Sequence, residues 1–161
     1  MHSRITPQDD RVFRGATERE RLRDVYLRVD ALVADVTCER STDCCHFERT
    51  GREPYVTPIE YAEARLAAKA SGFQASVRGS QRGRALPMAD EGRCPYLGSE
   101  GHCRIYASRP LGCRTFFCER ATGAAPRREV AALLREIVDL SEKLFVEGSK
   151  SRPLRSWVAS G

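Results

Sequence analysis

Residues 94–118 read CPYLGSEGHCRIYASRPLGCRTFFC, and this stretch decides how the middle of the chain can fold. It contains four cysteines, which are separated by eight, nine and four residues. Few large aliphatic side chains accompany them, so we expect apolar burial to be too weak to order this part alone. A structural metal can supply the missing stabilisation, because metal sites in small peptides contribute on the order of 10 kcal/mol of apparent binding free energy to folding.

A second group of cysteines lies upstream, where residues 38–46 read CERSTDCCH. The cysteine count of the chain is odd, which argues against a fully paired disulfide framework. The first residues contain no apolar stretch of the kind that a secretory signal needs, so we expect a cytoplasmic, reducing environment. Clustered cysteines there indicate metal ligands or redox groups. The candidate metal ligands are Cys38, Cys44, Cys45, Cys94, Cys103, Cys113 and Cys118.

Thiolates suit zinc and also the iron of iron–sulfur clusters. A structural zinc ion and a 4Fe–4S cluster each take four such ligands, so the seven cysteines allow one site with spare thiols or two neighbouring sites. His46 and His102 are further candidates because each follows or precedes a cysteine. The spacing does not choose between zinc, iron and an iron–sulfur cluster.

The two groups together resemble a known pattern. CERSTDCC fits a CxxCxxCC motif in which Ser41 takes the place of the second cysteine. Downstream, CPYL, CRIY and RPLGCRTF are similar to the block C-P-x-L, C-x-I-Y-x-x-R-P-x-x-C-R-x-F of the YkgJ-type cysteine-cluster family, a zinc- or iron-chelating domain. The resemblance spans roughly residues 36–120.

The resemblance implies a bacterial metal-chelating domain in which every candidate ligand except Cys118 is a family cysteine, and Cys118 is close enough to be a further ligand. Ser41 departs from the pattern, and a hydroxyl is a poor substitute for a thiolate on zinc or iron. The family also includes larger relatives, the flagellin lysine methylases, which pair this pattern with an iron–sulfur cluster. An iron–sulfur enzyme or enzyme accessory is therefore an alternative function.

Two arginines of the block are candidates for contacts that support the metal site. Arg109 and Arg114 flank Cys113, and their guanidinium groups can donate hydrogen bonds to thiolates or to a carboxylate. Either contact would offset the negative charge of a cysteine cluster. A structured turn at Arg109-Pro110 is the simpler interpretation.

Working outward from the cysteines, the chain predicts an α+β fold that is mainly α, with two long amphipathic helices and a shorter one around a small β-hairpin and the metal-binding core. The first long helix begins at Thr17, with Glu20 completing a capping box, and leads directly into Cys38. The other expected elements are a shorter helix from Thr57 to Gly72, a hairpin over 94–106, a helical turn over 111–118 and a long helix over 126–145.

The length of 161 residues predicts one domain. We expect a flexible arm over 1–16, a single domain over 17–147 with the cysteine core at 38–118, and a tail over 148–161. In the tail, Leu154, Trp157 and Val158 are able to dock back onto the domain.

Other function classes have less support in the sequence. No apolar run approaches the length of a membrane helix, so we expect no membrane partner. The net charge of +5 is interleaved with acidic residues, which disfavours a nucleic-acid partner, although a zinc-stapled interaction module using Arg78, Arg82 and Arg84 remains an alternative. The chain has no P-loop, dinucleotide-binding glycine pattern or zincin motif, so a non-enzymatic role is favoured. No protein partner is indicated.

Overall fold

The computed structural model describes residues 4–36, 42–75, 92–115, 126–146, 148 and 150–160. Three predicted features lie outside these ranges: the segment with Cys38 and Ser41, the arginine tract at 78–84, and Cys118. Within the described ranges the fold is mainly helical, with seven α-helices and one small antiparallel sheet. This confirms the expected fold class. Among the described helices, none combines the length and the apolar character that a bilayer span requires.

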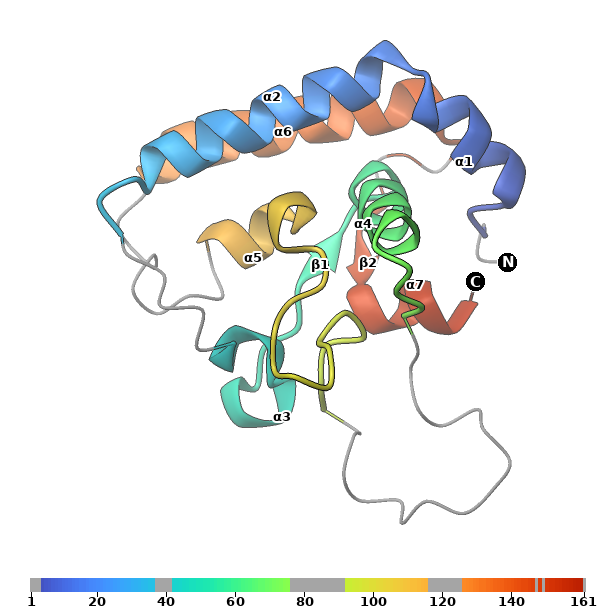
Figure 1. The fold of residues 1–161 in the computed structure, drawn as a ribbon. Helices are drawn as coiled ribbons and strands as arrows, with labels where there is room; N and C mark the ends of the chain where they lie inside the picture. The colour runs from blue at the N-terminus through green and yellow to red at the C-terminus, as the bar shows by residue number, and fades with distance from the viewer. Residues whose placement is uncertain are drawn as a thin grey trace.

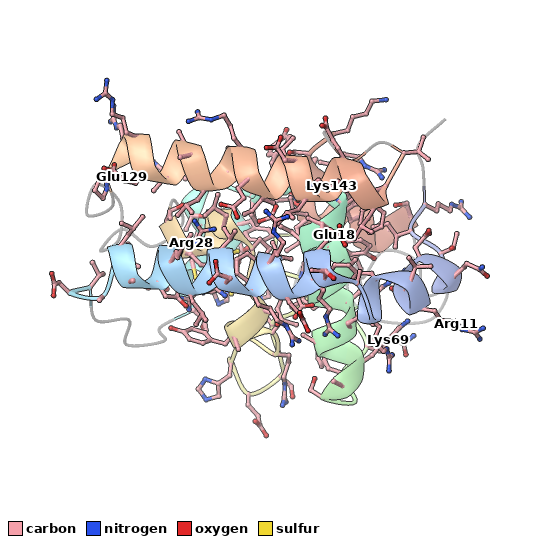
Figure 2. All side chains as sticks on the ribbon, turned by 90° about the horizontal axis from the view of Figure 1, so that it is seen from above. Arg11, Glu18, Arg28, Lys69, Glu129 and Lys143 are labelled. Atoms are coloured by element: carbon pink, nitrogen blue, oxygen red, sulfur yellow. The ribbon has the colours of Figure 1, made fainter. Side chains whose placement is uncertain are left out.

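Two long antiparallel helices form one layer of the molecule. Helix α2 (Thr17–Leu32) and helix α6 (Arg127–Leu144) run side by side. Figure 2 shows Glu18 near the same end as Lys143, while Glu129 lies at the opposite end. Leu22 and Ile137 are both completely buried, and burial of such a side chain is worth about 1.5–3 kcal/mol. The elements that carry the cysteines lie on one side of this two-helix layer (Figure 1).

The predicted bounds of these two helices are partly right. Residues 127–144 match the predicted third helix closely. Helix α2 begins one residue earlier than the predicted capping box implies, because Ala16 rather than Thr17 occupies the N-cap and makes no side-chain capping bond. It also ends at Leu32, and residues 33–36 form turns, so the helix does not run directly into the first cysteine.

Residues 5–14 do not form a frayed arm. Thr6 and Asp9 form a reciprocal capping box that starts helix α1 (Pro7–Arg14), and Gly15 ends it. Pro7 and Gly15 thus mark the two ends of a helix, so the expected flexible arm over 1–16 is wrong for residues 7–14. Phe13 is 1% exposed, and Asp10 pairs with Arg65 and Lys69.

Helix α4 (Pro58–Ala70) crosses beneath the two-helix layer. The predicted capping box is confirmed: the Thr57 hydroxyl accepts from the Glu60 N–H, and the Glu60 carboxylate accepts from the Thr57 N–H at 3.0 Å. The helix ends before Gly72, whose φ of +68° is in the left-handed region that favours glycine. Sequence and structure therefore agree at both ends of this helix.

Replacement of Thr57 by alanine should lower the free energy of unfolding by about 1–2 kcal/mol, because the first-turn N–H of Glu60 loses its acceptor. Thr57→Ser keeps the hydroxyl and should lie within about 0.5 kcal/mol of wild type. Denaturant unfolding of the three proteins measures both differences. Equal losses in the two variants would show that the methyl group matters rather than the cap.

The small sheet joins two distant segments. Strand β1 (Tyr55–Val56) pairs antiparallel with β2 (Arg152–Pro153), and β2 leads into helix α7 (Leu154–Ser160). Leu154 and Trp157 are almost completely buried, and the Trp157 indole donates to the Val56 carbonyl at 3.0 Å. The expected docking of the C-terminal residues is thus confirmed.

The predicted hairpin over 94–106 is reduced to a turn with one isolated bridge, between Leu97 and Cys103. Its first arm bends at once, because the Leu97 N–H donates to the Cys94 carbonyl at 3.0 Å, and Pro95 has no N–H for a ladder. After it come a 3-10 turn, η2 (Tyr106–Ser108), and helix α5 (Leu111–Thr115). Upstream, a second 3-10 turn, η1 (Asp43–Cys45), precedes helix α3 (Phe47–Thr50).

Candidate metal centre

The two cysteine groups meet through their backbones. The Cys94 N–H donates to the Cys45 carbonyl at 2.7 Å, and the Thr42 hydroxyl donates to the Gly101 carbonyl at 3.0 Å. Turn η1 is held by a further 2.7 Å bond from the Cys45 N–H to the Thr42 carbonyl, with Thr42 in the left-handed conformation. The segment over 42–46 therefore lies directly against the segment over 92–103.

Cys45 is the centre of the thiol contacts. Its side chain makes hydrogen bonds with the thiols of Cys103, Cys44 and Cys94, and these bonds raise the pKa of Cys45 far above its ordinary value. Cys45 thus keeps its proton more strongly than a free thiol does. We define the thiol cluster as Cys44, Cys45, Cys94 and Cys103.

Two members of the thiol cluster ionise more easily than a free thiol. The hydrogen bond from Cys45 and the charge of Arg109 together lower the pKa of Cys44 to about 7, against the opposing effect of burial. The same two groups lower the pKa of Cys103. Because the thiolate is the form that binds a metal, the lowered pKa values favour ligation by both side chains.

Cys113 lies near the thiol cluster on helix α5. Burial raises the pKa of Cys113 well above its ordinary value, and the charges of Cys94, Cys44 and Cys103 raise it further. Among the described cysteines it therefore favours the neutral form most clearly after Cys45. Burial and charge cause the pKa shift of Cys113, without a contribution from a hydrogen bond to the thiol cluster.

Helix α5 is positioned by a buried carboxylate. Glu60 is 2% exposed, and its second oxygen accepts from the Leu111 N–H at 2.8 Å, at the first residue of α5. Burial raises the pKa of Glu60, so a charged carboxylate there costs free energy that hydrogen bonds from Thr57 and Leu111 offset. One side chain thus caps α4 and α5 together.

Glu63, one turn along α4, ties the same region to α2. Its carboxylate is completely buried and accepts from Arg19 at 2.7 Å, from Arg23 at 3.0 Å and from the Ser108 hydroxyl at 3.1 Å. Paired in this way, the buried charge is compensated. Turn η2 is thereby fixed to two helices.

The two arginines of the cysteine block have different partners. Arg114 is 3% exposed and donates to the Asp30 carboxylate and to the carbonyls of Ala107 and Arg109. This is the predicted carboxylate contact, and it belongs to the packing of α5 on α2. Arg109 lies over the Tyr106 ring at 4.1 Å, and its charge acts on the thiol cluster.

The structure does not place either candidate histidine in the thiol cluster. His46 Nδ1 lies 3.2 Å from a carboxylate oxygen of Glu48, and His102 is exposed. Of the seven predicted ligands, the structure describes five and brings four of these into the thiol cluster. Within the described ranges, no three or more His, Cys, Asp or Glu side chains form a group arranged to hold a metal ion.

The donor chemistry of the thiol cluster nevertheless fits zinc or iron. Both metals take thiolate ligands, four to a site, and the cluster contains four thiols. Hydrogen bonds connect Cys45 to the other three thiols, and metal binding would replace these bonds. The charge of Arg109 compensates for anionic sulfur, which is the expected environment of such a site. A bound metal would serve as a cross-link between the segments over 42–46 and 92–103.

Sequence reasoning missed the residues that hold this region in place. Asp30 and Glu63 lie in helices without cysteines, and no motif marks them. Glu60 was recognised as a helix cap, but its bond to Leu111 is a tertiary contact between residues 51 positions apart. A local pattern contains no signal for such a contact.

Comparison with known proteins agrees with this chemistry. No curated protein and no solved structure matched the chain. A family model does match, over residues 37–131, and that family is described as a "putative zinc- or iron-chelating domain". The match covers more than half of the chain and includes all seven cysteines. This chain therefore belongs to the CxxCxxCC family of zinc- or iron-chelating domains.

Proposed function

We propose that this protein is a cytoplasmic bacterial metal-binding protein that holds zinc or iron through its clustered cysteines. The observation that carries the proposal is the thiol cluster, in which Cys45 contacts three other thiols contributed by two distant segments. Its four sulfurs equal the number of ligands in a closed thiolate site. We assign Cys44, Cys45, Cys94 and Cys103 to the main site.

The remaining cysteines form a second set in this proposal. Cys113 lies beside the thiol cluster, and Cys38 and Cys118 stand close in sequence to Cys44 and Cys113. Three thiols can hold a second, weaker ion, or supply replacements when the first ion is exchanged. Ser41 supplies a hydroxyl where the family motif has a cysteine, so we assign it no metal.

When bound, the metal supplies a cross-link, and in the case of iron a redox centre. The chain itself orients the ligands, compensates their charge with Arg109 and buries Cys45 and Cys94. This chemistry suits structural metal binding, metal handling or redox sensing, and it requires no catalytic side chain.

Anaerobic purification with elemental analysis and visible absorption tests the proposal. We expect one or two equivalents of metal per chain for single-ion sites, and about four equivalents of iron for a 4Fe–4S cluster. Colourless protein with zinc identifies a zinc site, whereas brown protein with iron and sulfide identifies an iron–sulfur cluster. A metal-free protein whose stability does not change on addition of Zn²⁺ or Fe²⁺ under reducing conditions would overturn it.

A further inference from the structure

The two-helix layer has an outer face that the other described elements leave open. Figure 1 shows α2 and α6 along the top of the molecule, with α4, α5, α7 and the small sheet below them. The outer face is the side of both helices opposite to their buried residues Leu22 and Ile137. A partner that docks there would meet the side chains of α2 and α6 and leave the cysteine segments uncovered.

Positive charge gathers on one half of the outer face. Arg28 of α2 binds Glu136 of α6 at 2.6 Å, and the two helices are antiparallel, so the C-terminal half of α2 lies beside the N-terminal half of α6. Four arginines and two glutamates on this half give it a formal charge of +2. They are Arg28, Arg127, Arg128 and Arg135, with Glu129 and Glu136. We call this half the basic half.

Negative charge gathers on the other half, which we call the acidic half. Its four acidic and two basic side chains give a formal charge of −2. They are Glu20, Asp24, Asp139 and Glu142, with Arg21 and Lys143. Between described residues, Arg28 forms ion pairs with Asp24 and Glu136 on this face, whereas Arg135 and Asp139 pair with no described residue. These two charges are therefore available to a partner.

A second copy of this chain matches the charge pattern in one orientation. If a two-fold axis runs across the helices, α6 lies antiparallel to α6 of the second copy, and each basic half faces an acidic half. If the axis runs along the helices, like charges face each other at both ends. Electrostatic complementarity therefore favours the first arrangement and disfavours the second.

Apolar side chains lie between the charges. Leu27 of α2 is 69% exposed and Leu134 of α6 is 42% exposed. A hollow of about 490 Å³ runs over α6 and is lined by Ala132, Leu134, Arg135, Glu136, Val138 and Asp139. Single exposed apolar residues are common on protein surfaces and do not identify an interface. Here they add contact area to a face whose charges already select the partner.

We propose that the outer face is the interface of a homodimer, in which the two-helix layers of two copies stack with α6 antiparallel to α6 and with each basic half on an acidic half. This inference goes beyond the proposed function and is independent of the metal that the cysteines bind. The cysteine segments lie on the other side of each layer, so both metal centres would stay accessible in the dimer.

The size of the outer face sets the expected strength of the dimer. Helices α2 and α6 contain 16 and 18 residues and are therefore about 24 and 27 Å long. Packed helices lie about 8–10 Å apart, so the face offers about 500 Å² per copy and a dimer buries about 1,000 Å². This area is near the lower limit for a specific interface. We expect micromolar affinity that falls with salt, because exposed charges are screened.

Sedimentation velocity of the reduced, metal-loaded full chain tests the proposal. Reducing agent prevents dimers that arise from intermolecular disulfides. We expect the wild-type protein to dimerise with a micromolar dissociation constant at about 50 mM NaCl, and at least about tenfold more weakly at about 500 mM. A dimer held by apolar contacts alone would not weaken in this way.

Two charge-reversal variants test the orientation. In R128E/R135E both halves become acidic, and in D139R/E142R both halves become basic. Each variant alone should dimerise at least about tenfold more weakly than wild type, because like charges then face each other. An equimolar mixture of the two should form a heterodimer, since opposite charges are restored. All four side chains are exposed, and circular dichroism checks that both variants fold.

The matched control is R11E/R52E, which makes the same change of net charge outside α2 and α6. It should dimerise within about twofold of wild type. Four results overturn the inference: a wild-type protein that stays monomeric at low salt, variants that dimerise as tightly as wild type, a mixture with no more dimer than either variant alone, or a control that loses the dimer as the variants do.

Discussion

Cys45→Ser protein should be purified without the metal that the wild-type protein retains. Cys45 contacts three of the other thiols, and its backbone carbonyl holds Cys94, so its replacement removes the one side chain common to all contacts of the cluster. Serine has nearly the same size but is a poor ligand for zinc or iron. Elemental analysis of the two proteins measures the loss directly.

The loss of metal should also be the largest single loss of stability in this chain. Thiolate metal sites contribute on the order of 10 kcal/mol to folding, which is comparable to the whole stability of a small domain. The effect should be local at first. Residues 42–50 and 92–105 have few buried aliphatic side chains, whereas the α2–α4–α6 core contains Leu22, Ile59 and Ile137.

Hydrogen exchange measured by mass spectrometry can separate these regions. We expect amides over 42–50 and 92–105 to lose protection in Cys45→Ser, while those of α2 and α6 keep most of theirs. Cys113→Ser tests the second set of cysteines and should leave the metal of the main site in place, because Cys113 lies beside the thiol cluster and is not assigned to the main site. A Cys45→Ser protein with the wild-type metal content would contradict the assignment of the main site.

Glu60→Ala should lower the free energy of unfolding by about 3 kcal/mol, the second largest effect we expect. The alanine leaves the N–H groups of Thr57 and Leu111 buried without acceptors, at about 1–3 kcal/mol each. Part of this loss is offset, because the variant no longer buries a carboxylate whose pKa is raised by desolvation.

Two comparisons make the measurement specific to this carboxylate. Glu60→Gln keeps one carbonyl oxygen, so one of the two N–H groups retains an acceptor, and about half of the loss should return. Glu129→Ala removes an exposed first-turn glutamate of α6 and should cost less than about 1 kcal/mol. Chemical denaturation of the metal-loaded proteins gives all three values. A Glu60→Ala variant no less stable than Glu129→Ala would show that the shared cap of α4 and α5 contributes little.

The elements that could be predicted are those whose signals are local. Thr57 and Glu60 start α4 within one turn of chain, and Gly72 follows its end. Local residues therefore determine both ends of this helix. The apolar stripe of α6 predicts its bounds within one residue. The candidate metal ligands are also predictable, since the number and clustering of the cysteines indicate metal binding before any contact is known.

The elements that could not be predicted depend on tertiary contacts. Helix α1 has only eight residues and is stabilised by the burial of Phe13 and by the contacts of Asp10 with α4. The sheet pairs strands of two residues each, which no alternation of polar and apolar residues can reveal. Asp30 reaches Arg114 across 84 positions, and only the folded chain shows that α2 takes part in the cysteine region.

The pairing of β1 with the C-terminal residues has a consequence for how the protein is made. The Trp157 indole and the Val56 carbonyl are 101 positions apart, so this contact closes after the cysteine segments have left the ribosome. Contacts of such high sequence separation are slow to form, because a long loop must be closed first. At synthesis rates of about 5–20 residues per second, the thiols spend several seconds outside a finished fold. During that interval they are exposed to oxidants and to competing metal ions.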